Sequence, residues 1–310
     1  MKDKAKAMVL ASFAADSLAL GAHWIYSTQK IARDFGRIET FLAPDPDSFH
    51  PTKKKGEFTH YGDQAFVLLE SLAARGGFDP GNYSMLWQQL FAVYKGYYDQ
   101  ATKVTLENLS LGKGHMEAGS SSNDLSGAVR MAPLAYCLGR DEEGLVLAAR
   151  TQTDMTHRDS LTVDASEFFA RMACRVMHGM TPVSALEEVS GTFFKGSQFQ
   201  RWALKGIESS SGESVPTIKA FGQDCHTPDA FPSVIHLVCR YENDLKEALV
   251  QNVMAGGDSA ARGMAVGMIL GAHLGMEAIP AEWIEGLKKR LEIENLLDKI
   301  RRGSVMKEES

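Results

Sequence analysis

The spacing of apolar residues narrows the folds open to this chain more than any other feature of its sequence. Intervals of three and four residues separate the members of two apolar stripes, Ala65, Leu68, Leu69 and Leu72 in one, and Leu86, Leu90, Val93 and Tyr97 in the other. This spacing places each set on one face of an α-helix, and the strict alternation expected of half-buried strands is not sustained anywhere. The sequence therefore predicts an all-α bundle.

Capping signals and polar stretches divide the chain into helices and loops. Thr181 followed by Pro182 is typical of an N-cap and first helical position, and Asp244 precedes another apolar helical stretch. Two stretches lack helical spacing, residues 45–62 and the glycine- and serine-rich residues 109–127. We expect both to be loops.

Composition favours one domain and excludes several classes of partner. The 310 residues carry 33 basic and 39 acidic side chains spread along the chain, so no basic footprint indicates nucleic acid or an acidic membrane. The four cysteines show neither zinc-type pairs nor disulfide density, and we place each in an apolar helical context, which fits a cytoplasmic setting. We expect neither a secretory signal nor a membrane span. A single domain over residues 1–303 is predicted, with a disordered tail over residues 304–310.

A ridge of glycines marks one late apolar helix. Glycine recurs at every fourth position, at Gly263, Gly267, Gly271 and Gly275. Each glycine costs up to about 1 kcal/mol of helix propensity, so a compensating contact is needed. Close packing against another helix is the simpler explanation, and direct contact with a ligand is the alternative.

Three polar residues near the N-terminus are candidates for a site. Asp16 shares a helical stripe with apolar residues, so its carboxylate faces inward and needs a partner. A buried hydrogen bond to a neighbouring helix end and a role in catalysis remain equal alternatives. His23 and Trp24 follow directly and could line a substrate pocket, although core packing also explains the tryptophan.

Two further carboxylates stand at predicted helix starts. Asp63 lies at or beside the N-cap of the helix that contains Leu68 and Leu72, and Asp258 precedes the glycine-ridged helix. Gly256 and Gly257 would let a ligand approach backbone N–H groups near the positive end of that helix. Simple capping explains each aspartate as well as a functional role does.

Two polar segments in the middle of the chain are also candidates. Ser122, Asn123 and Asp124 form a polar loop, and His157 closes a helix, where a histidine commonly serves only the helix dipole. No GxSxG elbow, phosphate-binding GxxxxGK[ST] loop or HExxH motif occurs. The commonest hydrolase and nucleotide-triphosphate sites are thereby excluded.

The order of these motifs resembles that of the ADP-ribosylglycohydrolase superfamily. The N-terminal Asp16 helix, the Asp63 helix start, the serine-asparagine loop before Arg130, the Thr156-His157 pair and the Gly256-Gly257-Asp258 turn follow one another over residues 7–290. The resemblance implies an orthogonal all-α bundle. It also implies a cleft with two magnesium ions, or manganese in some members, where the bond between ADP-ribose and a side chain or small molecule is hydrolysed.

The resemblance also reveals a depleted metal site. The first ligand motif of the family, of Thr-Asp-Asp-Thr type, aligns with residues 61–64, where Asp63 is the one aspartate, and the second leaves Asp258 followed by Ala260 and Ala261. Magnesium prefers oxygen ligands in octahedral geometry, so we expect one ion at partial occupancy or none, bound by Asp63 and Asp258. Similar losses are typical of the branch that includes jellyfish lens crystallins.

The resemblance implies a hydrolase that cleaves an N- or O-glycosidic bond of an ADP-ribosyl or related ribosyl substrate, either a small molecule or a modified protein. Asp63, Asp258 and Asp16 are the expected catalytic carboxylates, and Asp124 is expected to join them in the cleft. The substrate-binding candidates are Ser122, Asn123, Asp124, His157, Gly256, Gly257, His23 and Trp24. A binding or structural protein without turnover is the alternative, and a small-molecule glycosidase or nucleosidase is a third.

Overall fold

The computed structural model describes residues 2–308, and the side chains of residues 3–303 within them. The described residues form helices and two isolated β-bridges, but no strand. The helices of the first half are α1 (Lys2–Ala19), α2 (Thr28–Phe35), α3 (His60–Arg75), α4 (Pro80–Ala92), α5 (Gln100–Ser110), α6 (Ser126–Val129), α7 (Ala132–Leu138) and α8 (Glu142–Asp154). Those of the second half are α9 (Ser160–Met177), α10 (Pro182–Thr192), α11 (Gln198–Ser209), α12 (Ser214–Phe221), α13 (Thr227–Arg240), α14 (Leu245–Met254), α15 (Ser259–Leu274), η1 (Met276–Ala278), α16 (Ala281–Gly286) and α17 (Arg290–Glu308).

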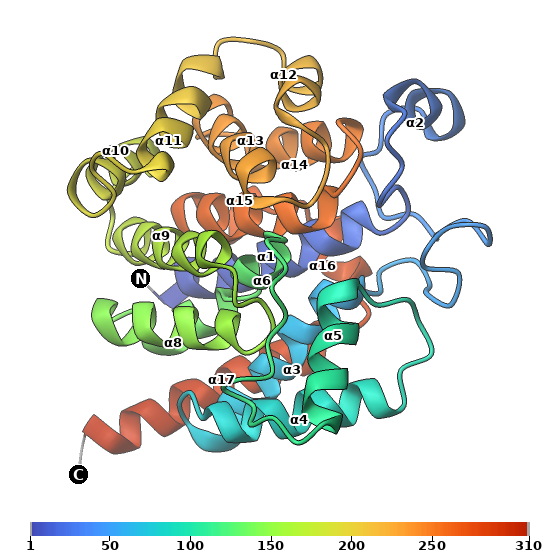
Figure 1. Cartoon of the computed structure of the whole chain (residues 1–310). Coiled ribbons are helices and arrows are strands. Elements are labelled where there is room, and N and C mark those ends of the chain that lie inside the picture. Colours follow the sequence, from blue (N-terminus) through green and yellow to red (C-terminus); the bar gives the residue numbers. More distant parts are fainter. Residues whose placement is uncertain (1, 309–310) are drawn as a thin grey trace.

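Helices α1 and α15 pack against each other at the centre of the molecule. Figure 1 shows α10 to α14 on one side of this pair and α3, α4, α5 and α17 on the other. Both central helices are buried along almost their whole length. The all-α prediction is confirmed, and the fold is built around one pair of helices from opposite ends of the sequence.

The glycine ridge of α15 packs directly on α1. A Cβ atom at Gly267 would lie 2.5 Å from the backbone oxygen of Ala11, and one at Gly271 would lie 2.8 Å from that of Ala7. Any side chain at these positions would force the helices apart, which offsets the low helix propensity of glycine. Gly275 differs from the rest of the ridge because it ends the helix with a φ of +82°. Tight packing therefore explains the ridge.

Helix boundaries follow the sequence signals closely. Thr181 caps α10 with Pro182 at its first position, and Asp244 caps α14 through a hydrogen bond from the backbone N–H of Glu247. The two expected loops lie between α2 and α3 and between α5 and α6. The helix α17 continues to Glu308, where the sequence led us to expect a tail from residue 304; residues 309–310 lie outside the described part of the chain.

None of the described helices is both long and apolar enough to cross a bilayer. The four cysteines form no disulfide with one another. Three of them lie in helices, but Cys225 lies between α12 and α13, in a segment without helical structure. The helical context expected for Cys225 was therefore wrong, because the turn at Gly222 ends α12 three residues earlier.

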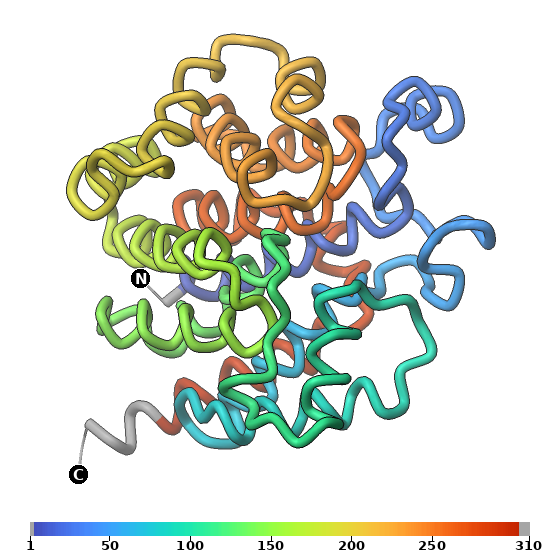
Figure 2. Tube along the Cα trace, in the orientation of Figure 1, coloured from blue at the N-terminus to red at the C-terminus, as the bar shows by residue number. Residues whose placement is uncertain are grey.

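The polar segments meet where several helices begin. The chain between α5 and α6 runs across the face of the molecule to the segment between α12 and α13, as Figure 2 shows for the green and gold parts of the trace. There, the backbone N–H of Leu125 donates to the carbonyl of Cys225 at 2.8 Å. Residues that are distant in sequence are thereby brought together around the N-terminus of α15.

Candidate active site

The turn before α15 is fixed by backbone hydrogen bonds to two other segments. Gly257 donates to Ile25 and accepts from Trp24, both at 2.9 Å, and the N–H of Asp258 donates to the carbonyl of Gln223 at 2.8 Å. Gly256 and Gly257 have φ values of +69° and +65°, and a Cβ atom at Gly257 would lie 1.9 Å from the oxygen of Gln223. Only glycine permits this turn and this close approach. Asp258 is therefore held rigidly as the N-cap of α15.

A second set of contacts fixes the loop that carries Asp124. Its backbone forms an isolated bridge with His226, and the carbonyl of Asn123 accepts from the N–H of Thr227 at 2.9 Å. The side-chain hydroxyl of Ser122 accepts the N–H of Asp124 at 3.2 Å. These contacts place Asp124 in front of the N-terminus of α15.

Asp124 and Asp258 form the centre of a buried acidic cluster with Cys225. One potential ligand atom from each of the three lies within 4.8 Å of the others. Asp258 is fully buried and Asp124 retains only 6% exposure, whereas Cys225 is partly exposed, so the cluster meets solvent at Cys225. Burial and the charge of Asp258 raise the pKa of Asp124 well above its usual value, and burial also raises the pKa of Asp258. The pair therefore retains a proton that exposed aspartates would lose.

Three neighbours stabilise the Asp258 carboxylate. The Tyr61 hydroxyl donates to Oδ2 at 3.0 Å, and the N–H of Ala261 donates to Oδ1 at 3.2 Å. The buried Arg262 adds a positive charge nearby; burial lowers its pKa to about 10, so it stays protonated at neutral pH. Burial also raises the pKa of Tyr61 well above its usual value, so its hydroxyl remains a donor.

Asp99 and His157 extend the cluster on the far side of Asp124. Asp99, Asp124 and His157 also offer one atom each within 4.8 Å of one another. Burial would raise the pKa of Asp99, but the hydrogen bonds from His60 at 3.3 Å and from the backbone N–H of Thr102 at 2.6 Å outweigh it and lower the pKa. Asp99 is therefore ionised while Asp124 and Asp258 share protons.

A stack of neutral rings forms the adjoining wall. His23 stacks on Trp24 and His50, with centroid distances of 4.3 and 5.4 Å, and its Nδ1 lies 3.9 Å from Oδ1 of Asp258. Burial and the neighbouring histidines lower the pKa of His23 well below its usual value and that of His50 to about 3. Neither ring has a hydrogen-bond partner. Trp24 alone among the described residues other than glycine has a positive φ, +63°, a strained conformation that orients its ring toward this stack.

The carboxylate of Asp16 forms hydrogen bonds to the residue that caps the N-terminus of α3. Its two carboxylate oxygens accept the N–H of Thr59 at 2.8 Å and the Thr59 hydroxyl at 2.5 Å. Thr59 is the N-cap of α3, and a Cβ atom at Gly62 would lie 2.4 Å from Oδ2 of Asp16. Burial raises the pKa of Asp16 to about 7. Of the two alternatives that the sequence left open, the structure shows the buried hydrogen bond to a helix end.

Asp63 faces away from Asp258. It lies in the first turn of α3 rather than at the N-cap, two residues after Tyr61, and two residues on a helix point about 200° apart. Its carboxylate forms an ion pair with Lys53 and accepts from the Tyr94 hydroxyl at 2.7 Å. The structure therefore brings Asp124 to Asp258, whereas Asp63 pairs with other residues beside a separate cavity.

The substrate-binding candidates are positioned in different ways. Asn123 holds His226, with 2.6 Å between Oδ1 and Nδ1, and His157 contacts the Thr156 hydroxyl through Nδ1 while its Nε2 has no partner. The N–H groups of Gly256 and Gly257 donate to carbonyls of the protein itself. The backbone donors that the glycine pair was expected to offer a ligand are therefore already used.

Several residues of the site carry weak signals in the sequence. His60 and Tyr61 precede Asp63, to which the motif pointed instead; Asp99 lies outside the helical patterns, Cys225 was expected in an apolar helix, and Arg262 lies on the glycine-ridged helix, whose pattern indicated packing. Asp99 does cap α5, accepting from the N–H of Thr102 at 2.6 Å. Its position after the aromatic stretch before α5 is the one local signal that could have identified it.

Comparison with known proteins places this arrangement in a family. The model of the ADP-ribosylglycohydrolase family matches residues 1–309. Crystallin J1A of Tripedalia cystophora is 22% identical over 94% of each chain, and the ADP-ribosyl-[dinitrogen reductase] glycohydrolase of Rhodospirillum rubrum is 27% identical over 78% of this chain and 77% of its own. A solved structure described as an ADP-ribosylglycohydrolase-related protein complex superposes with a TM-score of 0.77, at 22% identity and 98% coverage of both chains.

Proposed function

The chain belongs to the ADP-ribosylglycohydrolase family, and on this basis we propose that it hydrolyses an N- or O-glycosidic bond of an ADP-ribosyl or related ribosyl substrate. The observation that carries the proposal is the buried pair of Asp124 and Asp258, whose carboxylates lie within 4.8 Å and both hold raised pKa values. Two carboxylates with different protonation states are the usual equipment for cleaving a glycosidic bond. Of the three carboxylates that the sequence led us to expect as catalytic, this proposal retains Asp258.

The proton that the pair of Asp124 and Asp258 retains supports acid catalysis of bond cleavage. The protonated carboxyl group donates its proton to the leaving nitrogen or oxygen as the glycosidic bond breaks. The ionised partner attacks the anomeric carbon as the nucleophile, and the ester that forms is then hydrolysed by a water whose proton passes to the first carboxylate. The short separation of the two carboxylates favours this route, because direct attack by water needs carboxyl groups about 6.5–9.5 Å apart. Tyr61 and Arg262 stabilise the ionised form of Asp258, so we assign it the role of nucleophile and assign Asp124, whose pKa is raised by burial and by the charge of Asp258, the role of acid.

The neutral rings beside the pair suit a ribosyl substrate. His23 and His50 offer ring nitrogens without partners, which can exchange hydrogen bonds with sugar hydroxyls. Trp24 and Tyr97 contact each other edge to face at 5.1 Å and are partly exposed, so they form an aromatic wall at which a base or sugar face can stack. His157, with its free Nε2, completes the polar lining on the side of Asp99.

The side chains present do not fit two magnesium ions. We aligned the Thr-Asp-Asp-Thr motif of the family with residues 61–64, but Thr59 is the N-cap of α3, so we propose that the motif corresponds instead to Thr59, His60, Tyr61 and Gly62. The Tyr61 hydroxyl occupies one oxygen of Asp258, and the thiol of Cys225 is a poor ligand for a hard ion. We therefore derive no step through a metal, and one magnesium ion at partial occupancy is the most that the oxygens support.

A second candidate function is binding without turnover. The relatives include Crystallin J1A and Crystallin J1B of Tripedalia cystophora, each 22% identical to this chain. Asp258 and Tyr61 are both fully buried, so a substrate must displace neighbouring side chains to reach Asp258. In this alternative, the aromatic wall and the histidines form a nucleoside-binding or structural pocket.

One assay separates the two candidates. The protein is incubated with peptides that carry ADP-ribose on arginine or on serine, with and without magnesium, and the release of ADP-ribose is followed by chromatography. Binding of ADP-ribose is measured in parallel by calorimetry. Release that Asp124→Asn abolishes supports hydrolysis, whereas tight binding without release from any substrate supports the second candidate.

A further inference from the structure

The cavity on the Asp63 side of α3 belongs to no site described so far. It has a volume of about 350 Å³ and lies between the loop before α3, the end of α4 and the segment before α17. Its charged lining comprises Lys53, Glu57, Asp63, Lys95, Lys288 and Lys289. Four lysines thus face two carboxylates, in a chain whose formal net charge is −6.

Lysines outnumber the carboxylates that remain unpaired in this cavity, because Lys53 neutralises Asp63 and leaves Glu57 facing Lys95, Lys288 and Lys289. Asp63 pairs with Lys53 and accepts the Tyr94 hydroxyl, and Glu57 accepts the backbone N–H of Lys54 at 2.7 Å. Among the described residues, neither Lys95 nor Lys288 forms a salt bridge, and both are exposed. The charge left facing the cavity is therefore positive.

The wall that carries Lys288 is fixed to the loop opposite. The N–H of Lys288 donates to the carbonyl of Gly56 at 3.0 Å. Gly56 has a φ of +80°, and a Cβ atom there would lie 2.1 Å from the oxygen of Gly286. Only glycine fits this contact. The contact and the hydrogen bond together hold the loop before α3 and the segment before α17 at a fixed spacing.

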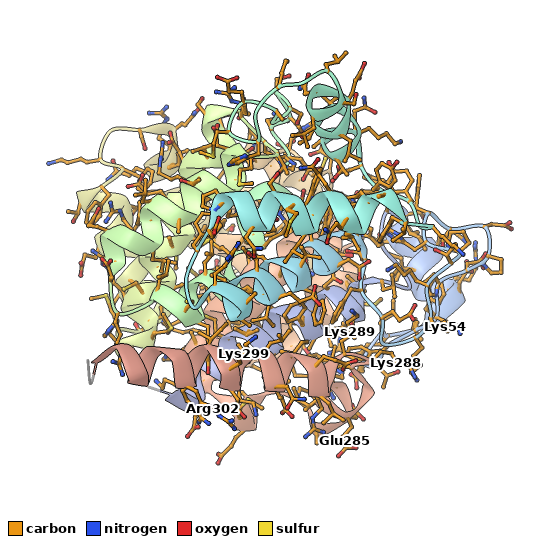
Figure 3. All side chains as sticks on the ribbon, turned by 90° about the horizontal axis from the view of Figure 1, so that it is seen from below. Lys54, Glu285, Lys288, Lys289, Lys299 and Arg302 are labelled. Carbon is orange, nitrogen blue, oxygen red and sulfur yellow. The ribbon has the colours of Figure 1, made fainter. Side chains whose placement is uncertain are left out.

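The lysines gather at one end of α17. Figure 3 shows Lys288 and Lys289 beside Lys54 at the start of this helix, whereas Lys299 lies farther along it. Lys289 lines the cavity and is half-buried, with its Nζ 3.8 Å from the centre of the Phe66 ring on α3.

We propose that this cavity binds a small organic phosphate. The ammonium groups of Lys95, Lys288 and Lys289 match the charge of a phosphate group, for which lysine is a common ligand. Leu90, Val93 and Phe58 line the remaining wall and would cover the carbon skeleton of the ligand. The volume lies at the lower end of the range for small-molecule sites, about 300–1,000 Å³, so the ligand is small. This inference does not depend on the proposed hydrolysis.

The test measures binding of glycerol 3-phosphate by calorimetry, with glycerol and inorganic phosphate as comparison ligands. Glycerol 3-phosphate is expected to bind and glycerol is not, and inorganic phosphate is expected to bind more weakly because it lacks the carbon skeleton. Charge reversal in Lys288→Glu or Lys289→Glu should weaken binding about tenfold or more, since each replaces an attraction with a repulsion close to the phosphate.

Lys299→Glu provides the matched control, because it makes the same charge change on α17, the helix that follows Lys288 and Lys289, outside the cavity. Its affinity should stay within about twofold of wild type. Equal weakening by Lys299→Glu would show a general charge effect and overturn the site. Absence of binding to the wild type, or equal affinity for inorganic phosphate, would overturn the assignment to an organic phosphate. Thermal unfolding of each variant verifies that it folds, and Lys288, being exposed, tolerates substitution even if Lys289 does not.

Discussion

Tyr61 and Asp63 lie two residues apart on α3 and face two different environments. The Tyr61 side is buried: the Tyr61 hydroxyl contacts the fully buried carboxylate of Asp258, which shares a cluster with Asp124, whose pKa is raised. The Asp63 side is open and basic, and its carboxylate is neutralised by Lys53. Low dielectric around Asp258 permits acid–base chemistry, whereas the open side suits charge recognition. Asp258 and Asp63 are the same type of residue, and the greater burial of Asp258 is what distinguishes their environments.

The difference between the two sides of α3 is tested most strongly by the substitution Asp124→Asn. If Asp124 is the general acid, the rate of hydrolysis should fall about a thousandfold, because amide nitrogen cannot supply the proton. Single-turnover release of ADP-ribose measures this change. Cys225→Ala, which alters the same cluster without removing a carboxylate, is the control and should retain most of the rate. Equal losses in both variants would show damage to the cluster rather than loss of an acid.

Asp16→Ala should weaken the fold by about 1–3 kcal/mol. The substitution leaves the N–H and the hydroxyl of Thr59 without their acceptors in a fully buried place, and unsatisfied buried donors carry a cost of that size. Urea unfolding followed by circular dichroism gives the free energy. A loss below about 0.5 kcal/mol would mean that the cap of α3 does not depend on Asp16.

The pKa of Asp16 predicts a pH dependence with a definite sign. The folded-state pKa is about 7 and the ordinary value is 3.8, so between these values the folded protein binds a proton that the unfolded chain releases. Stability from this group is therefore fully present below pH 3.8 and is lost as the pH rises toward 7. Relative to Asp16→Asn, the wild type should lose up to about 1.4 kcal/mol per pH unit in this window.

The difference in unfolding free energy between the wild type and Asp16→Asn is measured at pH 5, 6 and 7, and its change between successive pH values gives the slope. The subtraction is needed because the buried histidines act in the opposite sense: burial lowers the pKa of His50 to about 3 and that of His157 to about 3. A constant difference across the window would contradict the raised pKa of Asp16.

The smallest effect is expected on the open side of α3. Lys53→Met removes the ion pair with Asp63, in which the side chains of Lys53 and Asp63 are 14% and 13% exposed, and the Tyr94 hydroxyl remains to hold the carboxylate. The free energy of unfolding should change by no more than about 1 kcal/mol, and hydrolysis should be unaffected. A large loss of activity would place the chemistry on this side of the helix.

The sequence predicts the helices well because their signals are local. The caps at Thr181, Asp244 and Asp258 depend on residues within one or two turns, and the structure confirms each. The stripe from Leu68 to Leu72 lies on α3 as predicted, but the stripe from Leu86 to Tyr97 was wrong, because α4 ends at Ala92 and leaves Val93 76% exposed. The glycine ridge predicted a close helix contact, although its partner α1 could not be inferred from spacing alone.

The site was harder to predict because it is assembled from segments distant in sequence. Asp258 and Asp124 were both candidates, but the backbone contact between Leu125 and Cys225 that unites them leaves no trace in the pattern. Asp63 resembled a motif residue because an aspartate near a helix start usually marks the cap. The actual cap is Thr59, four residues earlier, and this shift turns Asp63 to the other face of the helix.

The central claim is that catalysis lies on the Asp258 side of α3, and a paired measurement of Asp258→Asn and Asp63→Asn tests it most directly. Both substitutions remove one charge and keep the shape of the side chain. Single-turnover hydrolysis of an ADP-ribosylated peptide should fall about a thousandfold in Asp258→Asn and stay within about threefold of wild type in Asp63→Asn. The reverse order, with Asp63→Asn inactive and Asp258→Asn active, would contradict the account.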